Sequence, residues 1–184
     1  MDHFYEDVYG FSQGDIFALY KKMVEKFSSG SHFVEVGTFL GKSAVYMAVE
    51  IINSGKLIKF DCIDHWLGSE EHKDNDKVDV DNLYEDFLKN IEPVKGIIKP
   101  VWVDSISASK LYKPNSLDFI FIDASHDEQS VKADLTYWMP RLKEDGIIAG
   151  DDIGNEGVAN AVKWFFDNEK LDILGRQWLV DLSK

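Results

Sequence analysis

The chain has 184 residues, of which 45% are hydrophobic, and this size suits one domain, residues 1–184, with a single core. Its formal net charge is −13, whereas a surface that binds nucleic acid would carry a basic patch or stripe. We therefore expect no nucleic-acid partner. No stretch approaches the ~18 apolar residues of a membrane helix, and the first residues lack the basic and apolar segments of a signal peptide.

The cysteine content agrees with a reducing compartment. Cys62 is the only cysteine and lies in an apolar run, so we expect a buried thiol and no disulfide within the chain. Together with the expected absence of a membrane segment, this predicts a cytoplasmic protein.

The first half of the chain alternates helices and strands. Ser12 and Asp15 have the spacing of a capping box, and apolar residues then recur with helical period, which predicts an amphipathic helix over 13–28. Periodicity further predicts a strand at 33–36, a helix at 41–53 and a strand at 57–63. Residues 68–82 are polar and rich in acids, so we expect an exposed loop there, followed by a helix at 81–91.

The second half continues this alternation. Residues 97–103 and 117–122 are short apolar runs, as expected for parallel strands covered on both faces. The spacing of Ser125 and Glu128 predicts a second capped helix, which Pro140 ends. A strand at 146–149, a helix around 158–166 and one or two strands within 171–182 complete the chain. The alternation predicts an α/β fold with a doubly wound, mostly parallel sheet in three layers.

The segment 33–43 joins a strand to a helix through a turn that contains two glycines. Such a turn forms a cradle for a polar ligand, because backbone N–H groups of the turn and the helix start face it. The turn is one residue too short for the phosphate loop GxxxxGK[ST], and Phe39 and Leu40 are too bulky for a loop around phosphates. Phe39 also replaces the second glycine of the dinucleotide motif GxGxxG. An ordinary strand-to-helix turn is the alternative.

Acidic residues stand at the ends of five predicted strands, namely Glu35, Asp64, Asp104, Asp123 and the pair Asp151 and Asp152. In an open parallel sheet, ligands bind in the crevice outside the carboxyl ends of the strands. Acids that meet in one crevice repel each other unless a cation neutralises them, and oxygen ligands suit Mg²⁺ or Ca²⁺. For each acid taken alone, simple solvation is the alternative.

The run Glu-Val-Gly-x-x-x-Gly-x-Ser at 35–43 resembles motif I of class I S-adenosylmethionine (SAM) dependent methyltransferases, especially the metal-dependent O-methyltransferases related to catechol O-methyltransferase. Residues 119–126 and 138–152 are similar to later segments of the group called methyltransferase family 24. The resemblance spans roughly residues 13–182. It implies a Rossmann-like methyltransferase fold in which a helical segment, here residues 1–30, partly covers the SAM site.

The resemblance also implies how SAM is bound. The glycine turn would pass under the methionine half, with Ser43 bonding its carboxylate, and Asp64 would hold both ribose hydroxyls. Trp66 would stack on adenine, or else pack against the sheet edge. The implied SAM-binding residues are Glu35, Gly37, Thr38, Gly41, Ser43, Asp64, His65, Trp66, Asp104, Ser105 and Asp123.

The resemblance assigns the chemistry to the other strand ends. Asp123 would be shared between the methionine ammonium and a divalent metal, with Asp151 and Asp152 as the further metal ligands. His126 lies where the catechol enzymes carry a basic catalytic residue, and a histidine with a pKa of about 6.5 suits removal of a hydroxyl proton near neutral pH. His126 and Asp123 are thus the predicted catalytic residues. Alternatively, His126 only occupies the first turn of its helix.

The sequence therefore predicts a SAM-dependent methyltransferase that methylates an oxygen of a small hydroxylated molecule or sugar with the help of Mg²⁺ or another divalent cation. A chain of this length leaves almost no substrate domain, so specificity would come from the N-terminal segment, an acidic loop or lid at 66–86 and the region 153–157, with a second copy in a homo-oligomer as a further contributor. The alternatives are a metal-independent methyltransferase, a SAM- or nucleotide-binding module without chemistry, and a nucleotide-binding enzyme of another class.

Overall fold

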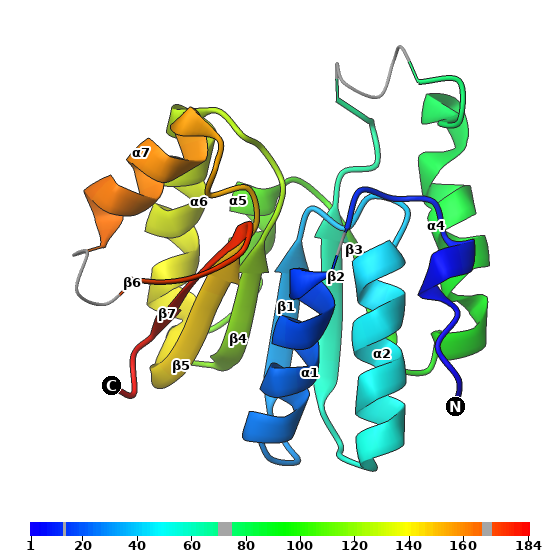
Figure 1. The fold of residues 1–184 in the computed structure, drawn as a ribbon, viewed down its shortest axis with the longest axis horizontal. Coiled ribbons are helices and arrows are strands. Elements are labelled where there is room, and N and C mark those ends of the chain that lie inside the picture. The colour runs from blue at the N-terminus through cyan, green and yellow to red at the C-terminus, as the bar shows by residue number, and fades with distance from the viewer. Residues whose placement is uncertain (13, 70–74, 167–170) are drawn as a thin grey trace.

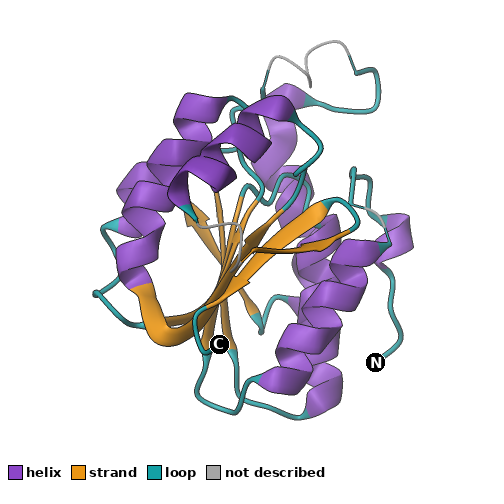
Figure 2. Cartoon of the chain, turned by 60° about the vertical axis from the view of Figure 1, so that its left-hand side comes forward, coloured by secondary structure: helices purple, strands orange, loops and turns teal. Residues whose placement is uncertain are grey.

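The protein is described by a computed structural model that covers residues 1–12, 14–69, 75–166 and 171–184. Its centre is a seven-stranded sheet with the strand order β3-β2-β1-β4-β5-β7-β6, between two layers of helices (Figures 1 and 2). Strands β1 to β5 pair in parallel, and β7 runs antiparallel to β5 and β6. The strands are β1 (His32–Val36), β2 (Lys59–Asp64), β3 (Ile98–Trp102), β4 (Leu117–Ile122), β5 (Leu142–Gly150), β6 (Leu171–Leu174) and β7 (Gln177–Asp181).

The helices divide between the two faces of the sheet. One face is covered by α1 (Asp15–Lys26), α2 (Lys42–Ser54) and α4 (Leu83–Ile91). The other face is covered by α5 (Ser105–Ser109), α6 (Glu128–Trp138) and α7 (Glu156–Phe165), and Figure 2 shows the sheet between these two layers. Short 3-10 helices lie at Tyr5–Asp7, Val80–Asn82, Glu92–Val94 and Met139–Arg141. The predicted doubly wound, three-layer α/β fold is confirmed.

Alternation along the central strands builds two separate cores. In β4, Phe119 and Phe121 face the layer of α1, α2 and α4, whereas Ile120 and Ile122 face the other layer. Successive side chains of a strand point to opposite faces, so a fully apolar strand supplies both cores at once. The strand at 97–103 was also expected to be covered on both faces, and this is wrong. It corresponds to β3, which is an edge strand whose Trp102 is 57% exposed.

Both predicted capping boxes are wrong in detail. Helix α1 begins after Gly14, which has no side chain to cap it. Helix α6 is capped by Asp127 rather than Ser125, because the Asp127 carboxylate accepts a hydrogen bond from Ser130 N at 3.0 Å. Helix α5, which was not predicted, is too short for a periodic pattern and begins where Asp104 accepts from Ser107 N at 2.9 Å.

One predicted helix start and part of the predicted exposed loop fall on residues that are not described. Residue 13 and residues 70–74 lie outside the described ranges, and so does the middle of the predicted acidic loop. After it, Val80–Asn82 leads directly into α4. Among the helices that the structure describes, none has the length and apolar character needed to cross a bilayer.

Candidate functional site

A cavity of about 830 Å³ opens at the carboxyl ends of the central strands. Its volume lies within the range of about 300–1,000 Å³ that is usual for small-molecule sites. Most of the predicted site residues line it: Gly37, Thr38, Ser43, Asp64, His65, Trp66, Asp104, Ser105, Asp123, His126, Asp151 and Asp152. Glu35 and Gly41 are not among the lining residues.

The glycine turn after β1 forms the floor of the cavity. Gly37 has φ +89°, and a Cβ at this position would overlap the carbonyl oxygen of Asp123 and lie 2.6 Å from the Cα atom of Ala124. Only glycine therefore fits between β1 and the end of β4. Gly41 also has a positive φ, +87°, and serves as the N-cap of α2, against the ring of Phe87.

Asp64 ties this turn to the end of β2. Its carboxylate accepts hydrogen bonds from the backbone N–H groups of Phe39 and Trp66, both at 2.8 Å. Phe39 has φ +51°, a conformation that side chains other than glycine rarely adopt, and these bonds hold it there. Each carboxylate oxygen keeps a second lone pair, so Asp64 can still accept from a ligand hydroxyl.

Trp66 packs under the cavity rather than projecting into it. The side chain is buried, its Nε1 donates to the carbonyl of Phe39 at 2.8 Å, and its ring lies 4.8 Å from Tyr84 and 4.7 Å from Phe87. These contacts favour the packing role over adenine stacking. The neighbouring His65 lines the cavity, and its Nδ1 accepts from Leu67 N at 3.0 Å.

Glu35 is buried beneath the cavity floor. Tyr20 of α1 donates to one carboxylate oxygen at 2.7 Å, and Ser43 of α2 donates to the other at 2.8 Å. Burial raises the pKa of Glu35 to about 7, although both hydrogen bonds act in the opposite direction. Glu35 therefore links α1, β1 and α2, and Ser43 connects this network to the cavity.

A second buried acid lies on the side of α5 and α6. Ser105 Oγ donates to Asp134, and Trp138 Nε1 donates to Ser105 Oγ at 2.9 Å. Burial raises the pKa of Asp134 to about 6, and this residue lines the cavity. Asp134 was not predicted as a site residue from the sequence. Its signal was an acid within the buried stripe of α6, which is formed by Val131, Asp134, Leu135 and Trp138.

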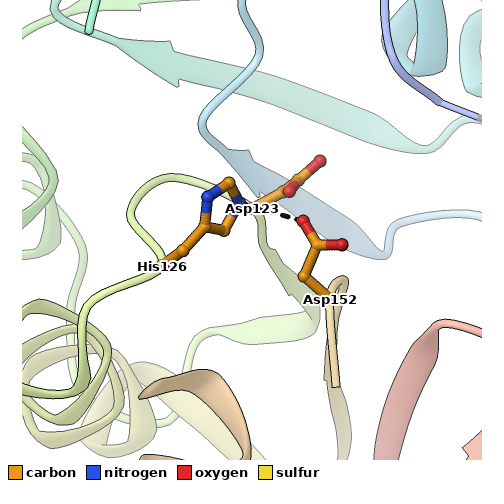
Figure 3. Close-up of side chains that lie close together, drawn as sticks. All are labelled: Asp123, His126 and Asp152. Atoms are coloured by element: carbon orange, nitrogen blue, oxygen red, sulfur yellow. Dashed lines mark ion pairs between the residues drawn. The ribbon is translucent and has the colours of Figure 1, made fainter. Parts of the chain in front are cut away.

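His126 and Asp152 form an ion pair at the opposite side of the cavity (Figure 3). The Nε2 atom of His126 lies 2.9 Å from Oδ2 of Asp152, and Asp123 lies beside them. Among the described residues, Asp123, His126 and Asp152 offer ligand atoms that all lie within 4.8 Å of one another. The hydrogen bond from His126 lowers the pKa of Asp152, whereas burial and the neighbouring acids raise the pKa of Asp123.

Asp151 takes part in a different set of contacts. It is 7% exposed, and its Oδ1 atom accepts from Gln177 Nε2 at 2.9 Å and from Asp152 N at 2.7 Å. Arg176, between β6 and β7, places Nε 3.7 Å from the same oxygen and forms an ion pair with Asp152. The structure thus joins Asp123 and Asp152 with His126, and turns Asp151 toward Gln177 and Arg176.

The sequence analysis missed Arg176. The chain holds only two arginines, and this one follows a glycine between two terminal strands. A cation beside a glycine within the predicted terminal strands was the available signal, but the pattern does not show that this segment reaches the acidic strand ends.

Residues 34–153, more than half of the chain, match the sequence model of a family described as "Methyltransferase domain". The chain belongs to this methyltransferase family. The methyltransferase predicted from the sequence is thereby confirmed as the class of this protein. No protein among those with curated functions matches the sequence.

Solved structures share the fold at low identity. The cofactor-bound Rv0187 protein from MTB has a TM-score of 0.67 at 12% identity, over 97% of this chain and 84% of that chain. The O-methyltransferase NovP has a TM-score of 0.66 at 13% identity, over 91% and 79%. The SMU.1697c protein of Streptococcus mutans, in complex with SAH, has a TM-score of 0.63 at 10% identity, over 93% and 99%. At these identities the likeness concerns the fold alone.

Proposed function

We propose that this methyltransferase transfers the methyl group of SAM to a hydroxyl oxygen of a small molecule, with His126 as the general base. The observation that carries the proposal is the 2.9 Å pair of His126 and Asp152 in the same cavity as the glycine turn. The neighbours with a bound cofactor or SAH support SAM as the methyl donor, and the O-methyltransferase NovP supports an oxygen acceptor. The net charge of −13 disfavours a nucleic-acid acceptor.

In this proposal SAM lies along the strand ends. Its methionine half occupies the turn at Gly37 and Ser43 beside Asp123, and its ribose reaches Asp64. Adenine extends toward Asp104 and Ser105. These positions follow the cavity from the end of β4 to the end of β3, and each of these residues lines it.

The pair of His126 and Asp152 supplies the proton transfer. A proton on Nε2 that faces Asp152 makes Nδ1 the basic atom of the neutral ring. During methyl transfer, the acceptor oxygen forms a bond to the methyl carbon, the carbon–sulfur bond breaks, and the hydroxyl proton passes to His126. Asp152 then stabilises the imidazolium and holds the ring orientation. The cavity aligns oxygen, methyl and sulfur in a line.

The magnesium site stays a prediction. The ligand atoms that the structure brings together at Asp123, His126 and Asp152 do not fit Mg²⁺. Mg²⁺ prefers an octahedral set of oxygen ligands, but the described group contains the nitrogen ligand His126. The two oxygens of Asp152 already contact His126 and Arg176, and Asp151 is directed to Gln177. The mechanism proposed here therefore contains no metal step.

We further propose that residues 1–184 act as one domain, with residues 1–30 as a cover. Gly10, Phe11 and Ser12 line the cavity, and the Phe11 ring stacks on Phe39 at 5.8 Å, which supports this role. Gly68, Ser69 and Leu83 support a covering role for the ends of the 66–86 segment. A cytoplasmic location agrees with the buried thiol of Cys62. We also propose a homo-oligomer, in which a second copy would complete the acceptor side of the cavity.

Calorimetry with SAM and SAH, followed by mass spectrometry of hydroxylated metabolites incubated with labelled SAM, tests the proposal. With an accepted substrate, His126→Asn should slow methyl transfer about 10²- to 10⁴-fold, the usual share of general acid–base catalysis. SAM affinity should stay within about threefold. Undiminished transfer in this variant would remove His126 as the base, and SAM binding without transfer to any acceptor would favour the non-catalytic module.

A further inference from the structure

Arg176 is held in place at the edge of the cavity by its own main chain. Its carbonyl accepts a hydrogen bond from Ile153 N at 2.9 Å, which joins the β6–β7 turn to the loop after β5. The preceding Gly175 has φ +61°, and the carboxylate of Asp15 lies against it, so that a Cβ would overlap this carboxylate. The turn is thus fixed from two sides, by the loop after β5 and by the start of α1.

The guanidinium group of Arg176 contacts two acids at once. It pairs with Oδ1 of Asp152 and lies 3.7 Å from Oδ1 of Asp151 through Nε. The Arg176 side chain is 48% exposed, whereas the side chains of Asp151 and Asp152 are 7% and 23% exposed. The positive charge is therefore more exposed to solvent than the two acids, and all three residues line the cavity.

Asp152 is shared between this cation and the proposed base. One carboxylate oxygen faces His126 Nε2 and the other faces Arg176. Arg176 contacts Asp152 through Oδ1 alone, so its positive charge holds that oxygen in place. The position of Arg176 therefore determines the direction in which Asp152 presents its second oxygen to His126.

We propose that Arg176 is the resident cation of the acidic cluster formed by Asp123, Asp151 and Asp152, in the place where a divalent metal was predicted. Acids that meet in one crevice need a positive charge, and this chain supplies it from the β6–β7 turn. Arg176 also positions Asp152 against His126, so the cluster keeps its shape without a bound metal ion.

Mn²⁺ is a direct probe of this role, because carboxylate oxygens are among the ligands that suit it. Its binding to the whole protein can be followed by the paramagnetic resonance signal of free Mn²⁺, without knowledge of the methyl acceptor. Arg176→Ala exposes the acids, and we expect it to bind Mn²⁺ at least tenfold more tightly than the wild type. Arg176→Lys keeps the charge and should remain within about threefold of the wild type.

Two controls locate the effect. Arg141→Ala removes the other arginine, at the far end of β5, and should leave Mn²⁺ affinity unchanged. Adding Asp152→Asn to Arg176→Ala should abolish the gain, because it removes one of the acids that would bind the ion. If circular dichroism shows that Arg176→Ala is unfolded, Arg176→Gln takes its place with the same expectations.

The proposal is overturned if the wild type binds Mn²⁺ as tightly as Arg176→Ala, since the guanidinium would then give way to the metal. It is equally overturned if neither protein binds Mn²⁺. The acids would then form no cation site even without Arg176, so Arg176 would not be taking the place of a metal ion. Calorimetry with SAM on the same variants separates this outcome from a failure of the methyltransferase proposal. We expect SAM affinity within about threefold for the Arg176 variants and within about tenfold for the variant that also carries Asp152→Asn.

Discussion

The two ends of the cavity are held together by different kinds of contact. At the end proposed to bind SAM, here called the cofactor end, Asp64 accepts hydrogen bonds from the main chain of Phe39 and Trp66. At the end proposed to face the acceptor, here called the acceptor end, Asp152 contacts both His126 and Arg176 through its side chain. One end is thus shaped mainly by the path of the backbone, and the other by the balance of charges.

This difference teaches where each end is sensitive. A change in backbone conformation should disturb the cofactor end most, because the turn fits closely against β4 at Gly37. A change in charge should disturb the acceptor end most, because loss of one partner leaves the other partly buried charges unpaired. The same cavity therefore has a half that depends on shape and a half that depends on charge.

The largest effect is expected for Gly37→Ala, which attacks the shape of the cofactor end. The new Cβ would overlap the main chain of Asp123 and Ala124, and the residue would have to keep φ +89°. We expect a loss of roughly 3–5 kcal/mol in the free energy of unfolding, the upper range for single substitutions. Urea unfolding measures it.

Gly30→Ala is the matched control for this substitution. Gly30 has a similar φ of +96°, but no atom lies within 4 Å of an added Cβ. Only the conformational cost of about 1–2 kcal/mol should remain. Equal losses in the two variants would show that the close fit against β4 contributes nothing, and the comparison of the two ends would fail.

The next effect concerns pH, because the cofactor end rests on one buried acid. The pKa of Glu35 is about 7 in the folded protein, against 4.5 for the ordinary group, so the folded state binds the proton more tightly. Its contribution to stability is therefore present at low pH and is lost as pH rises toward and through 7. Each pKa unit corresponds to about 1.4 kcal/mol, which amounts to about 3 kcal/mol lost between about pH 4 and pH 8.

Glu35→Gln isolates this contribution, because an amide of the same shape does not titrate. Urea unfolding of both proteins from pH 4 to pH 8 gives the difference in their free energies of unfolding, and other titrating groups cancel in it. We expect the wild type to lose stability relative to Glu35→Gln as pH rises. A difference that stays constant with pH would mean that Glu35 keeps an ordinary pKa in its hydrogen bonds to Tyr20 and Ser43.

The cofactor end was also the more predictable one from sequence. The strand, the glycine turn and the helix that form it are consecutive in the chain, so one motif contains most of the geometry. The acid of β2 could be placed because parallel strands end at the same edge of a sheet. The pattern left two roles open for Trp66, stacking on adenine or packing. It could not decide between them, because the packing partners Tyr84 and Phe87 belong to α4.

The acceptor end was less predictable because its members come from distant segments. His126, Asp152 and Arg176 follow β4, β5 and β6, and only the folded hairpin brings the last of them to the acids. The sequence predicted that the acids need a cation but not that an arginine is available for it. Helix boundaries failed for a local reason, because several polar residues near a helix start can compete for the cap, as Asp127 does with Ser125.

The smallest effect, and the sharpest comparison of the two ends, comes from the same substitution made at each. Asp64→Asn weakens the hydrogen bonds that shape the turn and removes the charge proposed to face the ribose, so SAM affinity should fall by about 1.5–3 kcal/mol, the range for hydrogen bonds to charged groups. Asp152→Asn removes the partner of His126 and Arg176 but leaves the turn intact, so SAM affinity should change by less than about 1.4 kcal/mol, or tenfold. Methyl transfer to an identified acceptor should show the reverse at saturating SAM, with Asp152→Asn slower than Asp64→Asn.

Calorimetry and initial rates on the two variants measure both quantities. If Asp152→Asn weakens SAM as much as Asp64→Asn does, the charges at the acceptor end also shape the cofactor end, and the division between the two ends is wrong.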